Sequence, residues 1–301
     1  MGTEQKVAVI TGASQGIGAA LVKAYRDRNY RVVATARSIK PSNDDDVLAV
    51  AGDIADAKTA ERVISQAMTR FGRIDTLVNN AGIFIARPFT DYSEAEFAAA
   101  LSVNLAGFFR ITQLAIAEME KQGSGHVVQV TTSLVDHAIE GVPSVLASLT
   151  KGGLNAATKS LAIEYAKRGI RVNAVSPGII KSPMHPVETH AALSALHPVG
   201  HMGEMSDIVD AILYLEGAGF VTGEILHVDG GQSAGHRDHP SHTLAGVIAW
   251  ATRDRRGFET RRIASANVTR RRRYRAGVEK RTRKRNEQAS GELRGQYPGY
   301  A

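Results

Sequence analysis

Short apolar runs alternate along the chain with longer segments in which apolar and polar residues mix at helical spacing. The apolar runs predict strands at residues 6–11, 31–36, 47–54, 76–81, 126–132, 171–178 and 224–231. The longer segments predict helices at residues 19–28, 58–71, 97–118 and 145–167. Such alternation is typical of βαβ units, which build a parallel sheet. The sequence therefore predicts an α/β fold with a doubly wound parallel sheet and helices on both faces.

The alternation ends near residue 232, and this marks a predicted domain boundary. Residues 1–232 carry 20 Lys/Arg and 24 Asp/Glu, whereas residues 233–301 carry 17 and 6. The second segment contains the basic clusters RRRRYR, from Arg270, and KRTRKR, from Lys280. A segment so charged cannot bury a core. We expect one domain over residues 1–232 and a basic, disordered tail over residues 233–301.

The tail also suggests unspecific binding to nucleic acid through its charge, with a strong dependence on salt. Tyr274, Tyr297 and Tyr300 give little aromatic interleaving for stacking on bases. We expect an appendage, or an extension without a role, in preference to a nucleic-acid-binding module.

Composition excludes several other classes of protein. The chain has no cysteine, which excludes disulfides and thiolate chemistry. No stretch reaches the roughly 20 apolar residues that span a bilayer, and the N-terminus lacks the pattern of a secretory signal. A cytoplasmic protein that does not bind a membrane is the expectation.

A glycine-rich turn, TGASQGIG, follows the first predicted strand and opens the first helix at Thr11–Gly18. In this context backbone N–H groups approach a pyrophosphate at the positive end of the helix. We assign the tight turn to Gly12, the close approach of the backbone to Gly16, and the packing of helix on strand to Gly18. The sequence thus predicts a Rossmann-type dinucleotide site.

The end of the second predicted strand indicates which dinucleotide binds. An acidic residue there accepts from a ribose 2′-OH, whereas an arginine accommodates a 2′-phosphate. This chain has Ala36 where the acid would stand, followed by Arg37. The alternative is that Arg37 is a solvated surface residue. We expect NADP(H) to be preferred over NAD(H).

Further motifs follow the glycine turn in a fixed order. They are Asp53-Ile54, Asn79-Asn80-Ala81-Gly82, Asn104, Ser133, Lys151, Asn173, Pro177-Gly178 and Val228-Asp229-Gly230-Gly231. Over residues 5–232 the chain resembles the short-chain dehydrogenases/reductases. The resemblance implies hydride transfer between a nicotinamide ring and a carbonyl or alcohol of a small organic substrate. It also implies a homo-oligomer, frequently a tetramer that pairs its long helices.

The resemblance further implies a set of cofactor-binding residues. Asp53 and Ile54 would contact the adenine, and the segment from Pro177 to Ile180, with Ser182, would hold the nicotinamide carboxamide. The full implied set is Gly12, Ser14, Gln15, Gly16, Ile17, Gly18, Arg37, Asp53, Ile54, Asn79, Ala81, Gly82, Lys151, Pro177, Gly178, Ile180 and Ser182.

The implied catalytic residues are Ser133, Lys151 and Asn104, but one member of the family's set is missing. In the family a serine bonds the substrate oxygen, and a tyrosine donates the proton. A lysine one helical turn later lowers the pKa of that tyrosine, and an asparagine completes a proton relay. The position four residues before Lys151 is Ala147 here. Alanine has no proton to give.

Three interpretations of Ala147 remain open. In the first, a water held by Lys151 and Ser133 delivers the proton. In the second, His137, in the loop after Ser133, delivers it. In the third, the protein binds the cofactor without efficient catalysis and works as a sensor or scaffold. We expect an NADP(H)-dependent oxidoreductase with an atypical site.

Residues 183–204 stand where the family has a segment that covers the substrate and changes on binding. This segment contains His185, His190, His197 and His201. Pro198 and Gly200 interrupt any helix that would align the last two, and no suitably spaced carboxylate joins them. We expect solvated histidines and no metal site.

Overall fold

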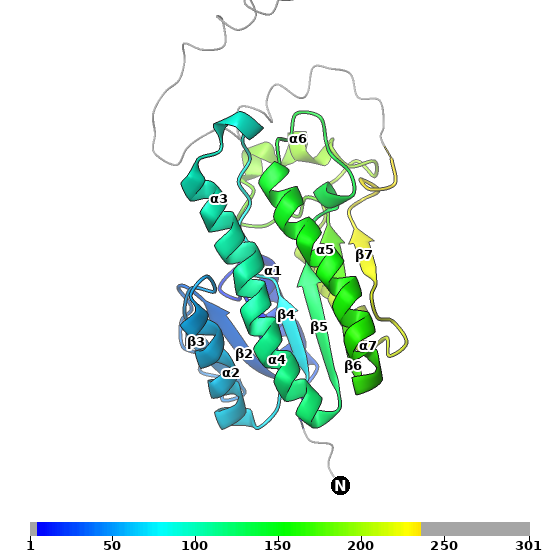
Figure 1. Cartoon of the computed structure of the whole chain (residues 1–301). Helices are drawn as coiled ribbons and strands as arrows, with labels where there is room; N and C mark the ends of the chain where they lie inside the picture. Colours follow the sequence, from blue (N-terminus) through cyan, green and yellow to red (C-terminus); the bar gives the residue numbers. More distant parts are fainter. Residues whose placement is uncertain (1–4, 236–301) are drawn as a thin grey trace, which may run out of the picture. The chain divides into compact units, whose positions relative to one another are not determined.

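The computed structural model describes residues 5–235, which form a parallel sheet of seven strands between two layers of helices (Figure 1). The strands are β1 (Val7–Thr11), β2 (Arg31–Ala36), β3 (Val47–Ala51), β4 (Thr76–Asn79), β5 (Gly125–Val130), β6 (Ile170–Pro177) and β7 (Ile225–Val228). Their order is β3-β2-β1-β4-β5-β6-β7. The order reverses between β1 and β4, and ligands of such sheets bind at the carboxyl ends of the strands there. The predicted basic tail lies outside the described residues from position 236 onward.

The longer helices are α1 (Gly16–Asp27), α2 (Ala57–Phe71), α3 (Glu94–Ala100), α4 (Phe108–Gln122), α5 (Val145–Tyr165) and α7 (Met205–Gly217). Shorter turns of helix are η1 (Phe89–Asp91), η2 (Leu101–Gly107), η3 (Ser133–Val135), η4 (Ala166–Arg168), η5 (Val187–Thr189) and α6 (His190–Ser194). Helices α2, α4 and α5 cover the face of the sheet that Figure 1 turns toward the viewer. Helices α1 and α7 pack together on the other face.

The alternation of side chains along β1 explains why its residues Val7 to Ile10 are all apolar. Val7 and Val9 point into the core beneath α2 and α4, whereas Ala8 and Ile10 point into the core beneath α1 and α7. All four side chains are fully buried. Because successive residues of a strand face opposite sides, a strand covered on both sides is apolar at most of its positions. The doubly wound α/β prediction is confirmed.

Elements α3, η2 and α4 form one continuous helix from Glu94 to Gln122, and its middle turn is a π-helix. Among the described helices, this one is long and apolar enough to cross a membrane by length and composition. The sequence did not indicate this, because polar residues interrupt its apolar stretches. In the structure its Ile111, Ile116 and Met119 are buried in the core shared with the sheet. Its apolar face therefore packs on the protein's own sheet.

Two further differences from the sequence prediction concern helices. Helix α1 begins at Gly16, three residues before the predicted start at Ala19, because the glycines of the motif form its first turn. Helix α7 was not predicted, although Ile208 and Ile212 lie one turn apart and are fully buried. A four-residue spacing of this kind is the helical signal that could have identified it.

Candidate functional site

The glycine turn between β1 and α1 adopts a backbone that side chains would disturb. Gly12 has a φ of +68°, and a Cβ there would lie 2.9 Å from the Cα of Ala81. A Cβ on Gly18 would lie only 2.2 Å from the carbonyl oxygen of Gly12. The turn therefore brings the first turn of α1 directly against the end of β1. The N–H groups of that first turn have no acceptor within the helix, which suits them to an anion.

Asn80 fixes this turn from the neighbouring strand. Its side-chain amide donates to the carbonyl oxygens of Thr11 and Gly12, at 3.0 and 3.2 Å. The hydroxyl of Thr11 accepts in return from the backbone N–H groups of Asn80 and Ala81, each at 3.0 Å. The segment that follows β4 and the glycine turn therefore form one hydrogen-bonded unit, although they are far apart in the sequence.

A cavity of about 410 Å³ extends from the glycine turn along the carboxyl ends of β1, β2 and β3. Its lining includes Arg37 at the end of β2 and Asp53 after β3. The implied cofactor residues found in its wall are Gly12, Ser14, Gln15, Gly16, Ile17, Arg37, Asp53, Ile54, Ala81, Gly82 and Ser182. A cleft with a side-chain-free turn at a helix N-terminus fits the pyrophosphate of a dinucleotide.

Two of the implied cofactor residues, Gly18 and Asn79, line no described cavity. Gly18 acts on the turn through its close packing. Asn79 is buried in the sheet, where its amide donates to Thr112 and Gln129, at 2.9 Å each. It therefore braces β4 against α4 and β5 and is placed to act on a cofactor only through the position of the strand.

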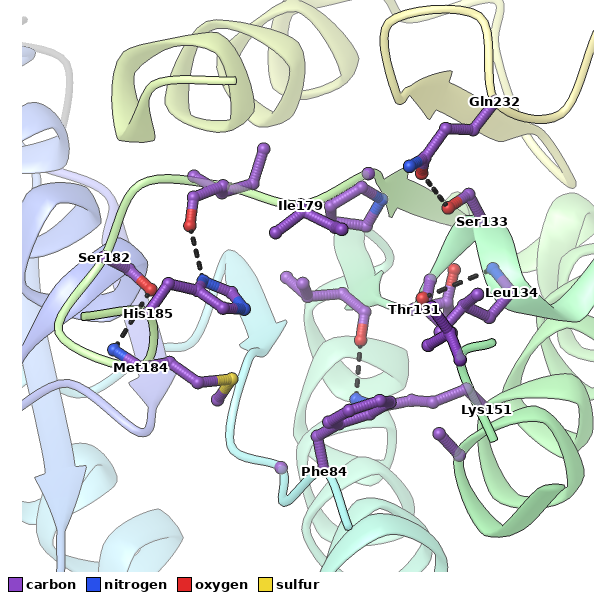
Figure 2. Close-up of a pocket in the computed structure, with 18 of the residues that line it drawn as sticks. Phe84, Thr131, Ser133, Leu134, Lys151, Ile179, Ser182, Met184, His185 and Gln232 are labelled. Atoms are coloured by element: carbon purple, nitrogen blue, oxygen red, sulfur yellow. Dashed lines mark hydrogen bonds between the residues drawn. The ribbon is translucent and has the colours of Figure 1, made fainter. Parts of the chain in front are cut away.

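A second cavity, of about 240 Å³, adjoins the first and shares Ile17, Gly82 and Ser182 with it (Figure 2). The remaining implied cofactor residues, Lys151, Pro177, Gly178 and Ile180, line this cavity. Ser133 and Ala147 lie in the same wall. The structure thus brings most of the predicted cofactor residues, together with the predicted catalytic residues Ser133 and Lys151, to two adjoining cavities at the carboxyl edge of the sheet. The third predicted catalytic residue, Asn104, lines neither cavity.

Lys151 lies buried on α5, and its ammonium group reaches back to the end of β5. Nζ donates to the carbonyl oxygen of Val130 at 2.7 Å. Burial lowers the pKa of Lys151 to about 8, because an apolar environment disfavours its charged form. A Cβ on Gly82 would lie 3.0 Å from Nζ, so this glycine leaves the room that the lysine needs.

Asn104 occupies the π-helical turn η2, and both N–H bonds of its side-chain amide are used within the protein. Oδ1 accepts from the N–H of Ile83 at 2.9 Å, while Nδ2 donates to the carbonyl oxygen of Ile83 and the hydroxyl of Thr150, at 3.0 Å each. Thr150 directly precedes Lys151. The observed side chain therefore braces the helix that carries the lysine.

Ala147 lies one turn before Lys151 on α5 and is 4% exposed. Its methyl group forms part of the cavity wall, in the position that the resemblance assigns to the phenol. No tyrosine is among the residues that line this cavity in the described part of the chain. Any proton transfer in this cavity would therefore use another group or water.

Ser133 begins η3 and is 1% exposed, and its hydroxyl donates to Oε1 of Gln232 at 2.8 Å. Gln232 also lines the cavity (Figure 2). The sequence analysis did not identify this residue. It follows the VDGG motif directly, so adjacency to that motif was the one signal available in the sequence.

Of His137 and His185, only His185 lines the cavity. His137, the predicted substitute for the tyrosine, is absent from the cavity wall, although its backbone N–H donates to the carbonyl of Ser133 at 3.0 Å. His185 lines the cavity, and its Nδ1 lies 2.9 Å from the carbonyl oxygen of Ile180. Since a carbonyl only accepts, Nδ1 carries the proton of the neutral ring. Burial lowers the pKa of His185.

The prediction that the four histidines of residues 183–204 are solvated is wrong for His197, which is 2% exposed. Its Nε2 accepts from the N–H of Ile179 at 2.9 Å, and its Nδ1 donates to the carbonyl of Leu193 at 3.0 Å. The ring is buried because it joins the covering segment to the strand end after β6. Within residues 5–235, no three His, Asp or Glu side chains are grouped as metal ligands.

Comparison with known proteins agrees with this geometry. A family model described as enoyl-(acyl carrier protein) reductase matches residues 12–233. An uncharacterized oxidoreductase of Thermotoga maritima is 34% identical over 256 residues, covering 78% of this chain and all of the relative. A 3-oxoacyl-(acyl-carrier-protein) reductase, FabG, of Vibrio cholerae is 33% identical over 242 residues, covering 77% of this chain and 98% of the relative.

Solved structures show the same fold. The structure of ElxO with NADP bound has a TM-score of 0.72 and 28% identity, and it covers 77% of this chain and 100% of that one. A 3-ketoacyl-(acyl-carrier-protein) reductase of Brucella melitensis complexed with NADH has a TM-score of 0.71 and 30% identity, covering 76% and 99%. The chain therefore belongs to the short-chain dehydrogenase/reductase family of oxidoreductases.

Proposed function

We propose that the protein is an NADP(H)-dependent oxidoreductase that interconverts a carbonyl and an alcohol on a small, largely apolar substrate. The observation that carries this proposal is the shared cavity. Lys151 and Ser133 line one hollow with Ala147, and the hollow adjoins the dinucleotide cleft. When bound, the nicotinamide supplies or accepts the hydride. The protein's part is to position the substrate oxygen and to move a proton.

The proton route runs through Lys151. Its ammonium group is held on the carbonyl of Val130 by one N–H and keeps two further N–H bonds. A water between Lys151 and the substrate oxygen, in the space beside Ala147, passes the proton during reduction. Of the interpretations of Ala147, we therefore favour the one in which a water delivers the proton, since His137 is absent from the cavity wall. The pKa of Lys151, about 8, lies near neutrality and suits proton transfer in both directions.

The lining indicates the substrate class. Phe84, Leu134, Val142, Ile179, Met184 and Leu193 supply most of the wall away from the reacting groups. Such a surface gains free energy from burying hydrocarbon or aromatic groups, at about 25 cal/mol per Å². We therefore expect ketones or secondary alcohols with apolar substituents. Consumption of NADPH with a panel of ketones, aldehydes and quinones tests the proposal, and no turnover with any of them contradicts it.

A second candidate function is cofactor binding without efficient turnover, as a sensor or scaffold. Two observations favour it: the side chain of Ala147 has no acidic proton to donate, and the hydroxyl of Ser133 is already engaged with Gln232. Tight NADPH binding together with no turnover across the substrate panel is the expected result for this alternative.

Arg37 is expected to decide cofactor preference. It is exposed and lines the dinucleotide cleft at the end of β2, next to Ala36. The parent protein should bind NADPH more tightly than NADH, and Arg37→Asp should reverse the order, because a carboxylate repels a 2′-phosphate and accepts from a 2′-OH. Titration of both cofactors by fluorescence checks this. Equal affinities of the parent protein for the two would contradict it.

We also propose that the protein forms a homo-oligomer, dimer or tetramer, through the outer face of α4 and α5. These helices lie side by side in Figure 1. Their outer face exposes Phe109, Leu149 and Ile163, the last of which is 81% exposed. Exposed apolar patches on long helices commonly mark contacts between subunits. Sedimentation should give an assembly for the parent protein and a smaller one for Ile163→Glu. A monomeric parent protein would rule this face out.

A further inference from the structure

Gln232 is buried between Ser133 and the segment that covers the cavity. The residue is 3% exposed. Its Oε1 accepts from the hydroxyl of Ser133 at 2.8 Å, and its Nε2 donates to the carbonyl oxygen of Leu196 at 3.2 Å. Leu196 lies just beyond α6, in the covering segment, whereas Ser133 lies at the end of β5. One amide thus connects a predicted site residue to the covering segment, and Figure 2 shows its bond to Ser133.

The two partners of Gln232 settle which way its amide faces. The carbonyl of Leu196 can only accept a hydrogen bond, so the NH₂ end of the amide must face it. The oxygen end then faces Ser133, and an amide oxygen can only accept. The single proton of the Ser133 hydroxyl is therefore committed to Gln232. Only lone pairs of this hydroxyl remain for a ligand in the cavity.

The backbone around Gln232 holds this arrangement in place. The carboxylate of Asp229 accepts from the N–H groups of Gly231 and Ser233, at 2.9 and 2.8 Å. Gly230 and Gly231 have φ angles of +61° and +90°, which bend the chain sharply after β7. The bend returns Gln232 toward the cavity between two residues that are fixed by one carboxylate.

We infer that Gln232 is a positioning residue that makes Ser133 a hydrogen-bond acceptor toward the ligand, so that the site binds a hydroxyl group in preference to a carbonyl group. This inference rests on the proposed function. It adds that the site without ligand is complementary to the alcohol and not to the ketone. The position of Ser133 alone does not decide between the two.

The chemistry of the two ligand groups explains the preference. A hydroxyl oxygen both accepts and donates, so while Lys151 carries its proton the alcohol accepts from the Lys151 side of the cavity and donates to Ser133. A ketone oxygen only accepts and meets lone pairs at Ser133. To bind the ketone equally well, Ser133 must turn its proton away from Gln232, which leaves the buried Oε1 without a donor. The alcohol requires no such change.

The test measures binding in complexes that cannot react: 1-phenylethanol with NADPH-bound protein, and acetophenone with NADP⁺-bound protein. We compare the parent protein with Gln232→Met, which keeps the length of the side chain but cannot accept from Ser133. The ratio of the two dissociation constants should move by about three- to tenfold toward the ketone, the range expected for one hydrogen bond. The control variant, Gln232→Glu, keeps an acceptor facing Ser133 but loses the bond to Leu196, so its ratio should lie closer to the parent ratio than that of Gln232→Met.

A second measurement needs no ligand. Unfolding of the parent protein, Gln232→Met, Ser133→Ala and the double variant forms a cycle, which should show coupling because each single change breaks the same bond. Additive effects in that cycle, an unmoved ratio, or no binding of 1-phenylethanol to the parent protein would each overturn the inference. Turnover with an unmoved ratio leaves the proposed function standing, whereas a shifted ratio without turnover leaves only the inference standing.

Discussion

Replacement of Lys151 by methionine is expected to lower the rate of NADPH-dependent reduction by about 10²- to 10⁴-fold, the range for loss of a positioned acid. No tyrosine of residues 5–235 lines the cavity, so under the proposed route the lysine and a water bound to it would carry the whole proton transfer. Steady-state kinetics at saturating NADPH provide the measurement. Lys151→Arg is the matched control, because it keeps the positive charge for the cofactor but releases no proton near neutral pH. Recovery of the rate in this arginine variant would contradict the role assigned to the lysine.

The same role fixes the pH dependence of the parent protein. The pKa of Lys151 is about 8, so the ammonium form predominates below pH 8 and the amine above it. Reduction needs the proton, so its kcat/KM should be level at lower pH and fall as the pH rises through about 8. Oxidation needs the amine and should rise over the same interval. A reduction profile that shows no fall there would assign the proton to another group.

Replacement of Ala147 by tyrosine is expected to raise the rate of reduction by at least about tenfold, part of the 10² to 10⁴ available to a positioned acid. Ala147 lies in the wall of a cavity of about 240 Å³, which leaves space for a ring. A phenol there would hold its proton beside Lys151 in one geometry, whereas a water must be ordered anew for each reaction. Turnover of the best ketone in the panel is the measurement.

The control for this variant is Ala147→Phe, which adds the ring without the hydroxyl and should fall below the parent rate. The added ring also risks a loss of stability of about 1 to 3 kcal/mol through overpacking near Leu146. Thermal melts with and without NADPH separate that loss from a change in chemistry. If the folded tyrosine variant binds NADPH but is slower than the parent protein, the space beside Ala147 belongs to the substrate.

Sequence reasoning reached those parts of the site that depend on local geometry. The turn at Gly12 needs a positive φ and Gly18 needs the absence of a Cβ, so the pattern of glycines, strand and helix states the structure directly. The four-residue spacing from Ala147 to Lys151 likewise places both side chains in one cavity wall, because the helix repeats at that interval.

The parts that sequence reasoning missed depend on contacts between distant segments. Ser133 and Gln232 are 99 residues apart in the chain, and no sequence motif near either residue indicates that the two are in contact. His197 resembles a surface histidine in its segment, yet its ring is buried against the N–H of Ile179. The resemblance to the family predicted a segment that covers the substrate, but not the hydrogen bonds that join this segment to Ile179 and Gln232. Those bonds depend on how the folded chain brings distant residues together.

The amide of Asn104 has a consequence for how this lineage tolerates change. Asn104 holds Ile83 and Thr150 together, so the placement of Lys151 on α5 has a support that does not involve the side chain at position 147. We therefore expect the framework and the proton donor to be separable, so that a change at position 147 leaves the fold and the cofactor cleft in place. Such a scaffold permits exchange of the acid while the hydride site persists, which offers an evolutionary route from one carbonyl chemistry to another.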